Sequence, residues 1–302
     1  MLSICIPIYN FYVDELVNEL HSQALLLKID FEIILIDDFS ETLFKNQNKC
    51  LVELPNVKYI ELPENIGRSK IRNLFLKHAQ FNYLLFLDCD AYIDSKSYLK
   101  KYIKSIKPET NVLCGGLSYN LKKTEKKYRL RWKYGLKKEV LSLNYRLENP
   151  YKSFNTIHFL IKRAILQNIP FEERIAGYGH EDTFFGYQLK MNKIAITHID
   201  NPVINDSLES NEEFITKSEQ AIQNLIHIKN ILSHNPDFEK DITLLNTYSK
   251  LKKLRIIFLV NYFWIVTHSL IRKSLILGCT NINLFSFYKL GYFIRKQHFS
   301  QI

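Results

Sequence analysis

Several patterns that carry familiar chemistry are missing from this chain of 302 residues. Its five cysteines are widely spaced and form no CxxC pair. This argues against a zinc site and a disulfide framework, and it fits a reducing, cytoplasmic location. The chain has no GxxxxGK[ST] loop, which argues against a P-loop nucleotidase. It also has no HExxH helix and no GxSxG elbow, so neither a zinc protease nor a serine hydrolase is indicated.

Long apolar runs are missing as well. No basic region precedes the first apolar run, so no signal peptide is predicted. The most apolar stretch, residues 256–266, is interrupted by Asn261 and flanked by Arg255 and His268. A membrane-spanning helix needs about 20 apolar residues, so this stretch is too short to predict one.

What the chain does have is apolar composition for a full core and a strong positive charge. Hydrophobic residues make up 46% of it, and it contains no internal repeat or low-complexity tract. The formal net charge is +10. Such an excess favours an anionic partner, which can be a nucleic acid, an acidic membrane surface or a phosphorylated substrate.

Short apolar runs alternate with segments of helical spacing in the first part of the chain. Strands are expected at 3–8, 31–36, 57–62, 83–87, 112–119, 158–161 and 194–199. Helices are expected at 13–28, 42–54, 68–79, 96–106 and 182–190. The alternation predicts an α/β fold with a parallel sheet covered on both faces. We expect a catalytic domain over 1–210 and a helical extension over 211–302.

Carboxylates follow two of the expected strands at the point where each strand ends. One apolar run is followed directly by Asp37 and Asp38, and another by Asp88 and Asp90. The carboxyl ends of parallel strands meet at one edge of a sheet, where open α/β folds bind ligands. Asp88 and Asp90 would share one face of an extended segment, and two oxygen donors suit Mg²⁺ or Mn²⁺.

Five motifs in a fixed order give the chain a family resemblance. They are SICIPIYN at 3–10, IDDFS at 36–40, NIGRSKIRN at 65–73, DCD at 88–90 and GYGHED at 177–182. Over roughly residues 2 to 205 they resemble the family 2 glycosyltransferases of GT-A fold, of the bacterial surface-polysaccharide type. The resemblance implies a Rossmann-like, mixed but mostly parallel sheet flanked by helices.

The resemblance also implies roles for individual residues on the donor side. The expected donor is a nucleoside-diphosphate sugar, more readily UDP-linked than GDP-linked. The residues expected to bind it are Pro7, Tyr9, Asp38, Gly67, Arg72, Asp88 and Asp90. Tyr9 would lie against the base and Asp38 would accept from its ring N–H. Asp90, supported by Asp88, would hold Mn²⁺ or Mg²⁺ at the diphosphate.

The last motif is expected to serve the acceptor. Asp182 would deprotonate the acceptor hydroxyl and Glu181 would orient the acceptor sugar, so that attack opposite the diphosphate inverts the anomeric carbon. His198 is the expected third metal ligand. The resemblance implies a histidine a few residues after the Asn-Pro-Val segment, where this chain has Asn205 and Asp206, which leaves the third ligand open.

Each of these residues also has a simpler reading. The acid pairs can start turns or cap helices, as Asp and Glu commonly do. His198 can be a satisfied strand histidine, and Arg68 and Arg72, one helical turn apart, can face solvent. The basic stretch 122–138 can be a solvated face, a contact for the acceptor or a nucleic-acid surface. We favour the acceptor and expect no nucleic acid, because no nucleic-acid module accompanies the stretch.

The C-terminal part indicates a location. Between Leu251 and Lys296, aromatic and aliphatic residues mix with Lys and Arg, and acids are absent. An apolar face with cationic flanks suits helices in an anionic membrane interface. We therefore expect a peripheral protein at the inner face of the cell membrane. The alternative is a helical subdomain packed on the core or on a second subunit.

Three functional classes follow from these observations. The first is an inverting, metal-dependent transferase that moves a sugar to a glycan or a lipid-linked oligosaccharide. The second is a catalytically silent relative that acts as a membrane scaffold. The third is a sugar-phosphate nucleotidyltransferase, whose glycine-rich loop should follow the first strand. Tyr9, Asn10, Phe11 and Tyr12 stand there instead, which argues against this third class.

Overall fold

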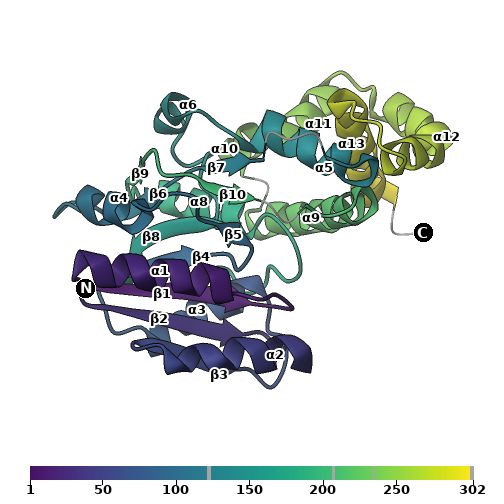
Figure 1. Cartoon of the computed structure of the whole chain (residues 1–302). Helices are drawn as coiled ribbons and strands as arrows, with labels where there is room; N and C mark the ends of the chain where they lie inside the picture. The colour runs from purple at the N-terminus through teal and green to yellow at the C-terminus, as the bar shows by residue number, and fades with distance from the viewer. Residues whose placement is uncertain (121–123, 206–207, 234, 300–302) are drawn as a thin grey trace. The chain divides into compact units, whose positions relative to one another are not determined.

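The computed structural model describes residues 1–120, 124–205, 208–233 and 235–299 (Figure 1). The chain forms two compact units. Unit 1 comprises residues 1–120, 140–176 and 181–207, and unit 2 comprises 121–139, 177–180 and 208–302. Unit 2 thus takes up two segments that the predicted contiguous domain over 1–210 had included.

Unit 1 is built on a seven-stranded sheet in the order β3-β2-β1-β4-β8-β6-β9. Its strands are β1 (Leu2–Ile8), β2 (Phe31–Asp37), β3 (Val57–Glu61), β4 (Tyr83–Leu87), β6 (Val112–Cys114), β8 (His158–Lys162) and β9 (Ile196–His198). Only β8 runs antiparallel to its neighbours, so this sheet is mixed and mostly parallel, as predicted. Every residue of β2 is buried, which is typical of a central parallel strand covered on both faces.

Helices cover both faces of this sheet. They are α1 (Asp14–Leu27), α2 (Thr42–Lys49), α3 (Arg68–His78), α4 (Tyr98–Ser105), α6 (Leu143–Glu148), α7 (Arg163–Asn168) and α8 (Glu181–Met191). Apolar residues of α3, α7 and α8 share one core cluster with alternate residues of the strands. The other face carries α1 and α4, which pack on each other (Figure 1). The expected helix 42–54 is shorter, because residues 50–53 form a 3₁₀ turn.

The strand register brings the acidic strand ends to one edge of the sheet. Ile8 pairs with Asp37 across β1 and β2, and Asp37 pairs with Glu61 across β2 and β3. On the other side of β1, Cys5 pairs with Phe86 of β4, so Asp88 follows at the same edge. The sequence pattern and the topology therefore agree on where a ligand would bind.

The expected strand 112–119 is wrong as a single element. It breaks at Gly115 and Gly116 into β6 and β7 (Leu117–Tyr119), and β7 joins a small second sheet in the order β5-β10-β7. The partners of β7 there are β5 (Ala91–Tyr92) and β10 (Val203–Asn205). Gly116 has a φ of +95°, and a Cβ on Gly115 would collide with the His158 ring and the Asn201 carbonyl. Only glycine fits such a close approach without displacing its neighbours.

A buried histidine explains that close approach. The His158 Nε2–H donates to the Gly116 carbonyl at 2.5 Å, and Nδ1, an acceptor in this tautomer, lies 2.9 Å from each of the Tyr98 and Tyr102 hydroxyls. Burial lowers the pKa of His158 to about 4, so the ring is neutral at pH 7. This neutral ring joins α4 to the break between β6 and β7.

Unit 2 is helical. It contains α5 (Arg129–Tyr134), a π-helical turn (Gly135–Glu139), α9 (Asn211–Ile231), α10 (Pro236–Asp241), α11 (Thr243–Lys253), α12 (Ile257–Ile276) and α13 (Ile282–Phe299). A capping box starts α9, with Ser210 and Glu213 each accepting from the other's backbone N–H. Apolar residues of α5, α9, α12 and α13 form its core.

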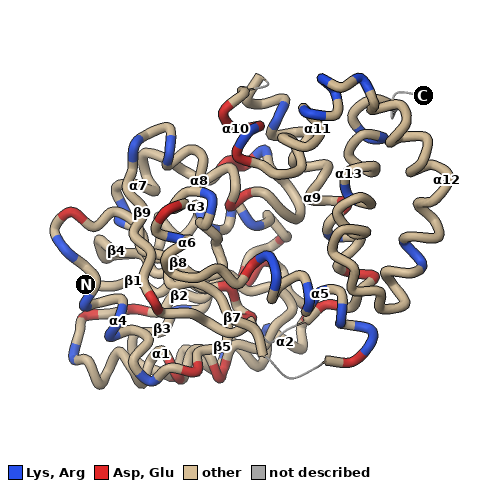
Figure 2. The backbone as a smooth tube through the Cα atoms, turned by 90° about the horizontal axis from the view of Figure 1, so that it is seen from above, with Lys and Arg blue, Asp and Glu red and all other residues tan. Residues whose placement is uncertain are grey.

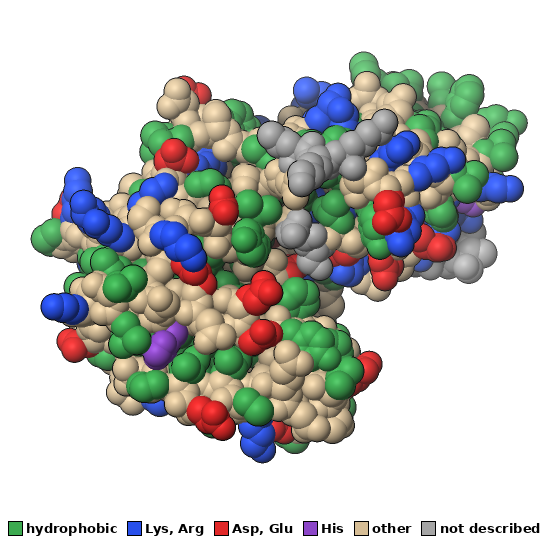
Figure 3. Space-filling view, viewed as in Figure 1, with side chains coloured by type: hydrophobic (Ala, Val, Ile, Leu, Met, Phe, Trp, Pro, Cys, Tyr) green, Lys and Arg blue, Asp and Glu red, His purple; other side chains and the backbone are tan. Residues whose placement is uncertain are grey.

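The outer face of α12 differs from the rest of unit 2. Large apolar side chains stay exposed along it, and Figure 3 shows hydrophobic side chains gathered where this helix lies. The tube of α12 carries no acidic residue in Figure 2. Within the described part of the chain, no single helix has the length and apolar composition to cross a bilayer. The pair α11 and α12, bent by 119°, passes that test only when taken together.

Candidate active site

The loop after β2 is held together by its two carboxylates. Asp37 is fully buried and accepts from the Ser40 N–H at 2.7 Å and from the Tyr59 hydroxyl at 3.0 Å. Asp38 accepts from the N–H groups of Ile66 and Gly67 at 2.7 and 3.0 Å. Asp38 therefore already organises the turn before α3, in addition to its predicted contact with the base.

The environment of Asp38 favours a proton more than an exposed carboxyl would. Burial raises the pKa of Asp38, the two backbone N–H groups lower it in part, and the nearby Asp37 charge raises it further. Gly67 sits at the end of this turn with a φ of +82° and is the N-cap of α3. Tyr9, at the end of β1, is 55% exposed, so its ring is open to a planar ligand, while Pro7 lies within β1 beside Ile36.

Arg72 reaches the acidic motif that follows β4. Its Nη2 lies 2.7 Å from Asp88 Oδ1, and only 2% of the arginine side chain is exposed. Asp88 and Asp90 lie in a turn closed by the Ala91 N–H on the Asp88 carbonyl, so the expected extended segment is wrong. The structure places Arg72 on Asp88, between α3 and β4, and rules out the reading in which it faces solvent.

The same arginine approaches the acidic pair at the start of α8. Glu181 Oε1 lies 3.9 Å from Arg72 Nη1 and 3.3 Å from Arg68 Nη1. Burial alone would raise the pKa of Glu181, but the Arg68 and Arg72 charges outweigh it, so this pKa is lowered. The side chain of Glu181 is 5% exposed, which makes it an ionised anchor for both arginines.

Asp182, the next residue, has the opposite electrostatic environment. Burial and the charge of Glu181 raise the pKa of Asp182 to about 6, although the Thr183 N–H and hydroxyl donate to its Oδ1. A carboxylate with a pKa near the working pH suits proton transfer, because it is ionised yet basic enough to accept. Two adjacent acids thus differ in acidity because Arg68 and Arg72 outweigh burial at Glu181, whereas at Asp182 burial and the Glu181 charge outweigh the weaker effect of Arg72.

The structure does not support His198 as a metal ligand. It lies on β9, and β8 and β6 stand between β9 and β4, a lateral distance of about 14 Å at about 4.8 Å per strand. Both ring nitrogens are engaged, Nδ1 with Arg146 at 3.3 Å and Nε2 with the Pro150 carbonyl at 2.9 Å. These contacts favour the reading of His198 as a satisfied strand histidine.

Sequence reasoning missed Arg146, which organises this part of unit 1. It is 5% exposed and donates to the carbonyls of Cys114 and Ile199 as well as contacting His198. A single arginine in a helical segment has no pattern around it, so no signal in the sequence singled it out.

The two aspartates after β4 fit a divalent cation as a partial set of ligands. Asp88 and Asp90 are both half-buried and lie at the carboxyl edge of the sheet. Across the described residues, no group of three or more His, Cys, Asp and Glu side chains is arranged to hold a metal ion. Mg²⁺ is commonly bound through one or two carboxylates, with substrate phosphates and water completing its shell, so this donor set is sufficient.

One arginine of the basic stretch 122–138 is structural, while Lys126, Lys127, Lys137 and Lys138 are exposed. Its residues 122 and 123 lie outside the described part of the chain, as does Asp206. Arg131 is buried in unit 2, where it pairs with Glu139 at 3.0 Å and Glu209 at 3.5 Å and stacks on Phe214. Arg131 is thus committed to the interior of unit 2.

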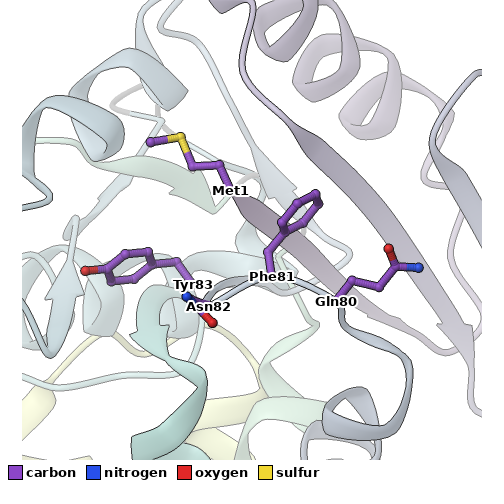
Figure 4. Close-up of a pocket in the computed structure, with 5 residues that line it drawn as sticks. All are labelled: Met1, Gln80, Phe81, Asn82 and Tyr83. Carbon is purple, nitrogen blue, oxygen red and sulfur yellow. The ribbon is translucent and has the colours of Figure 1, made fainter.

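Unit 1 also has a pocket away from the acidic motifs. It is lined by Met1, Gln80, Phe81, Asn82 and Tyr83 (Figure 4). These residues stand at the amino ends of β1 and β4, whereas the carboxylates follow the carboxyl ends. We assign it no part in the chemistry described above.

The fold and these acidic motifs define a class of protein. The sequence model of glycosyl transferase family 2 matches residues 3–173, more than half of the chain, and the chain belongs to this family. The matched segment includes the loop after β2, the turn before α3 and both aspartates after β4. The acids at the start of α8 lie just beyond it.

Two curated relatives have closely related names. The poly(ribitol-phosphate) β-N-acetylglucosaminyltransferase TarS of Staphylococcus aureus is 35% identical over 103 residues, which is 32% of this chain and 17% of TarS. The poly(ribitol-phosphate) β-glucosyltransferase of Bacillus spizizenii is 34% identical over 120 residues, which is 38% of this chain and 19% of the relative. The matches therefore span less than a fifth of each relative's length.

Solved structures share the fold across the whole chain. S. aureus TarS 1-349 in complex with UDP-GlcNAc has a TM-score of 0.54 and 19% identity, covering 99% of this chain and 93% of that one. The mannosyltransferase PcManGT of Pyrobaculum calidifontis, in complex with GDP-Man and Mn²⁺, has a TM-score of 0.62 and 14% identity, covering 100% and 88%. At these identities the likeness establishes the fold alone.

Proposed function

We propose that the protein is an inverting glycosyltransferase that uses a nucleoside-diphosphate sugar. The observation that carries the proposal is the placement of Arg72 between Asp88 and Glu181, at 2.7 and 3.9 Å. One buried cation thereby brings the expected donor motif and the expected acceptor motif into a single cluster within unit 1.

On the donor side, the protein offers a ring, a turn and two carboxylates. Tyr9 would lie against the base, and Asp38 would accept from its ring N–H while continuing to hold the Ile66–Gly67 turn. UDP is our proposed nucleotide, because the relatives with the higher sequence identity include one whose solved structure holds UDP-GlcNAc. Asp88 and Asp90 would hold Mg²⁺ or Mn²⁺, which neutralises charge on the departing diphosphate.

On the acceptor side, Asp182 would remove the proton from the attacking hydroxyl. The acceptor oxygen forms a bond to the anomeric carbon as the bond from that carbon to the diphosphate oxygen breaks. Attack from the face opposite the diphosphate inverts the configuration, and the proton stays on Asp182 until it passes to solvent. Glu181 holds Arg68 and Arg72 in place. Its carboxylate would also orient the acceptor sugar by accepting hydrogen bonds from the sugar hydroxyls.

The proposed acceptor is a bacterial cell-surface glycan or a lipid-linked precursor of one. The names of the two curated relatives specify poly(ribitol-phosphate), an anionic polymer. The net charge of +10 is suited to an acceptor of this kind.

Calorimetric titration of UDP, GDP and their common sugar conjugates, each with Mn²⁺ and with EDTA, tests this proposal. We expect Mn²⁺-dependent binding of one nucleotide, and loss of that dependence in Asp90→Ala. Folded wild-type protein that binds none of these compounds would favour a catalytically silent scaffold. Binding of a nucleoside triphosphate with a sugar phosphate, and release of pyrophosphate, would instead favour a nucleotidyltransferase.

A further inference from the structure

The outer face of α12 is an apolar surface that soluble monomers rarely display. Its residues Phe258, Leu259, Tyr262, Phe263, Val266 and Leu270 are each between 61% and 75% exposed. They recur at helical spacing, so they form one continuous stripe, here called the α12 face, which Figure 3 shows as clustered hydrophobic side chains. Contiguous exposed patches of several such residues mark surfaces that bind something.

The opposite face of the same helix is firmly packed within unit 2. Asn261, Trp264, Ile271 and Leu275 are buried. The Trp264 Nε1–H donates to the Tyr288 carbonyl of α13 at 3.2 Å, and Gly291 has no side chain where the indole ring lies. These contacts fix the rotation of α12 about its own axis. The α12 face therefore points away from the core of unit 2.

The charges on α12 and in the segments next to it in the sequence are of one sign, and the acids nearest to it are Glu212 and Glu219 of α9, which pair with Arg272. No Asp or Glu follows Asp241 in the sequence. Lys252, Lys253 and Arg255, all exposed, come just before α12, and Lys273 is exposed in its last turn. In Figure 2 the tube along α12 shows basic segments and no acidic one. An apolar stripe with cations at both ends is complementary to a surface whose outer layer is anionic and whose interior is apolar.

We propose that the α12 face binds the surface of an anionic phospholipid bilayer. The helix lies in the plane of the interface, with its aromatic and aliphatic side chains among the acyl chains and its flanking Lys and Arg side chains at the headgroup phosphates. Unit 2 then serves as the membrane-attachment unit of the protein. The inference is independent of which nucleotide or sugar unit 1 uses.

Flotation of the full-length protein with vesicles tests the proposal. Phosphatidylcholine vesicles with phosphatidylglycerol should carry the protein, and vesicles of phosphatidylcholine alone should carry much less of it. The variant Leu259→Gln/Phe263→Gln/Leu270→Gln should bind the anionic vesicles at least tenfold more weakly. The matched control Leu25→Gln/Leu26→Gln/Leu43→Gln, at exposed apolar positions of α1 and α2, should bind as the wild type does. Removing Lys252 and Lys253 should weaken binding by roughly fivefold per charge and reduce its salt dependence.

A second readout does not depend on how stable the triple variant is. Phe263→Trp should gain fluorescence quenching by brominated phosphatidylglycerol over the wild-type background, and Leu43→Trp should gain none. Equal quenching at the two positions, or unchanged flotation of the α12 variant, would overturn the proposal. So would concentration-dependent association in sedimentation velocity that disappears in the α12 variant while no vesicle binding is seen, since the partner would then be a second copy of the chain.

Discussion

Asp182 and Glu181 are neighbours in the chain, yet their carboxyl groups have different acidities. If Asp182 is the base, Asp182→Asn should lower the transfer rate by about 100-fold or more while donor binding stays unchanged. Because its pKa is raised to about 6, the wild-type rate should fall about tenfold per pH unit below that value. Steady-state rates from pH 5 to 8, with nucleotide titrations of both proteins, check this. A variant of full activity would remove Asp182 from the role of base.

The free energy of unfolding of unit 1 should depend on pH through the protonation of His158. Its folded-state pKa is lowered to about 4 from an ordinary value of 6.5, so the unfolded chain takes up a proton first as the pH falls. Stability from this group is therefore complete above about pH 6.5 and is lost towards pH 4, by at most on the order of 3 kcal/mol.

Urea unfolding at pH 7 and pH 5 measures that loss. His158→Gln keeps polar atoms for the tyrosine hydroxyls and the Gly116 carbonyl but does not titrate. Its midpoint should therefore change less between the two pH values than the wild-type midpoint does. An identical pH dependence in the two proteins would show that His158 is not the titrating group.

Some of these residues were predictable from sequence and others were not. The carboxylates after β2 and β4 were visible because an apolar run stops abruptly at an acid. The position of His198 was not, because the sequence shows that it lies in a strand but not that two further strands separate that strand from β4. The partners of Arg72 were hidden for the same reason, since Asp88 and Glu181 lie 16 and 109 positions away from it.

At the scale of elements, Arg72 ties α3 to the end of β4. Arg72→Gln would leave the buried Glu181 and the half-buried Asp88 short of a cation, and breaking a buried pair in this way costs about 3 kcal/mol. Arg68→Gln is the matched control, because the Arg68 side chain is 44% exposed and its pair with Glu181 should contribute about 1 kcal/mol or less. Chemical denaturation compares them. Equal losses in the free energy of unfolding would mean that Arg72 contributes no more to stability than the exposed Arg68.

The break between β6 and β7 depends on the absence of a side chain. Gly115→Ala places a methyl group against the His158 ring and the Asn201 carbonyl, which should cost about 1 to 3 kcal/mol. Gly67→Ala is a useful comparison, since its φ is +82° but nothing lies within 4 Å of the added carbon. It should cost only the backbone strain of its φ of +82° and ψ of 171°, a combination that essentially only glycine populates, about 1 to 3 kcal/mol. Both variants should have lower unfolding midpoints than the wild type, and an unchanged midpoint for Gly115→Ala would contradict this account.

At the scale of the whole molecule, periodicity predicted the α/β class and most of the strands of the main sheet. It failed at residues 112–119, where the apolar pattern continues across two glycines although the backbone turns into another sheet. It also did not separate residues 121–139 from the catalytic domain. Their assignment rests on packing of Leu130 against α9, α12 and α13, which local sequence does not encode.

Residues 177–180 belong to unit 2 although they lie between two segments of unit 1, and this limits where the coding sequence can be divided. The chain passes between its units five times, and the shortest visit ends directly at Glu181. During that visit Asn224 of α9 donates to the carbonyls of Tyr178 and Gly179, and Ala221 fills the space beside Gly179. A stop codon or a crossover near residue 208 would therefore remove the partners of the turn that leads into the acidic pair.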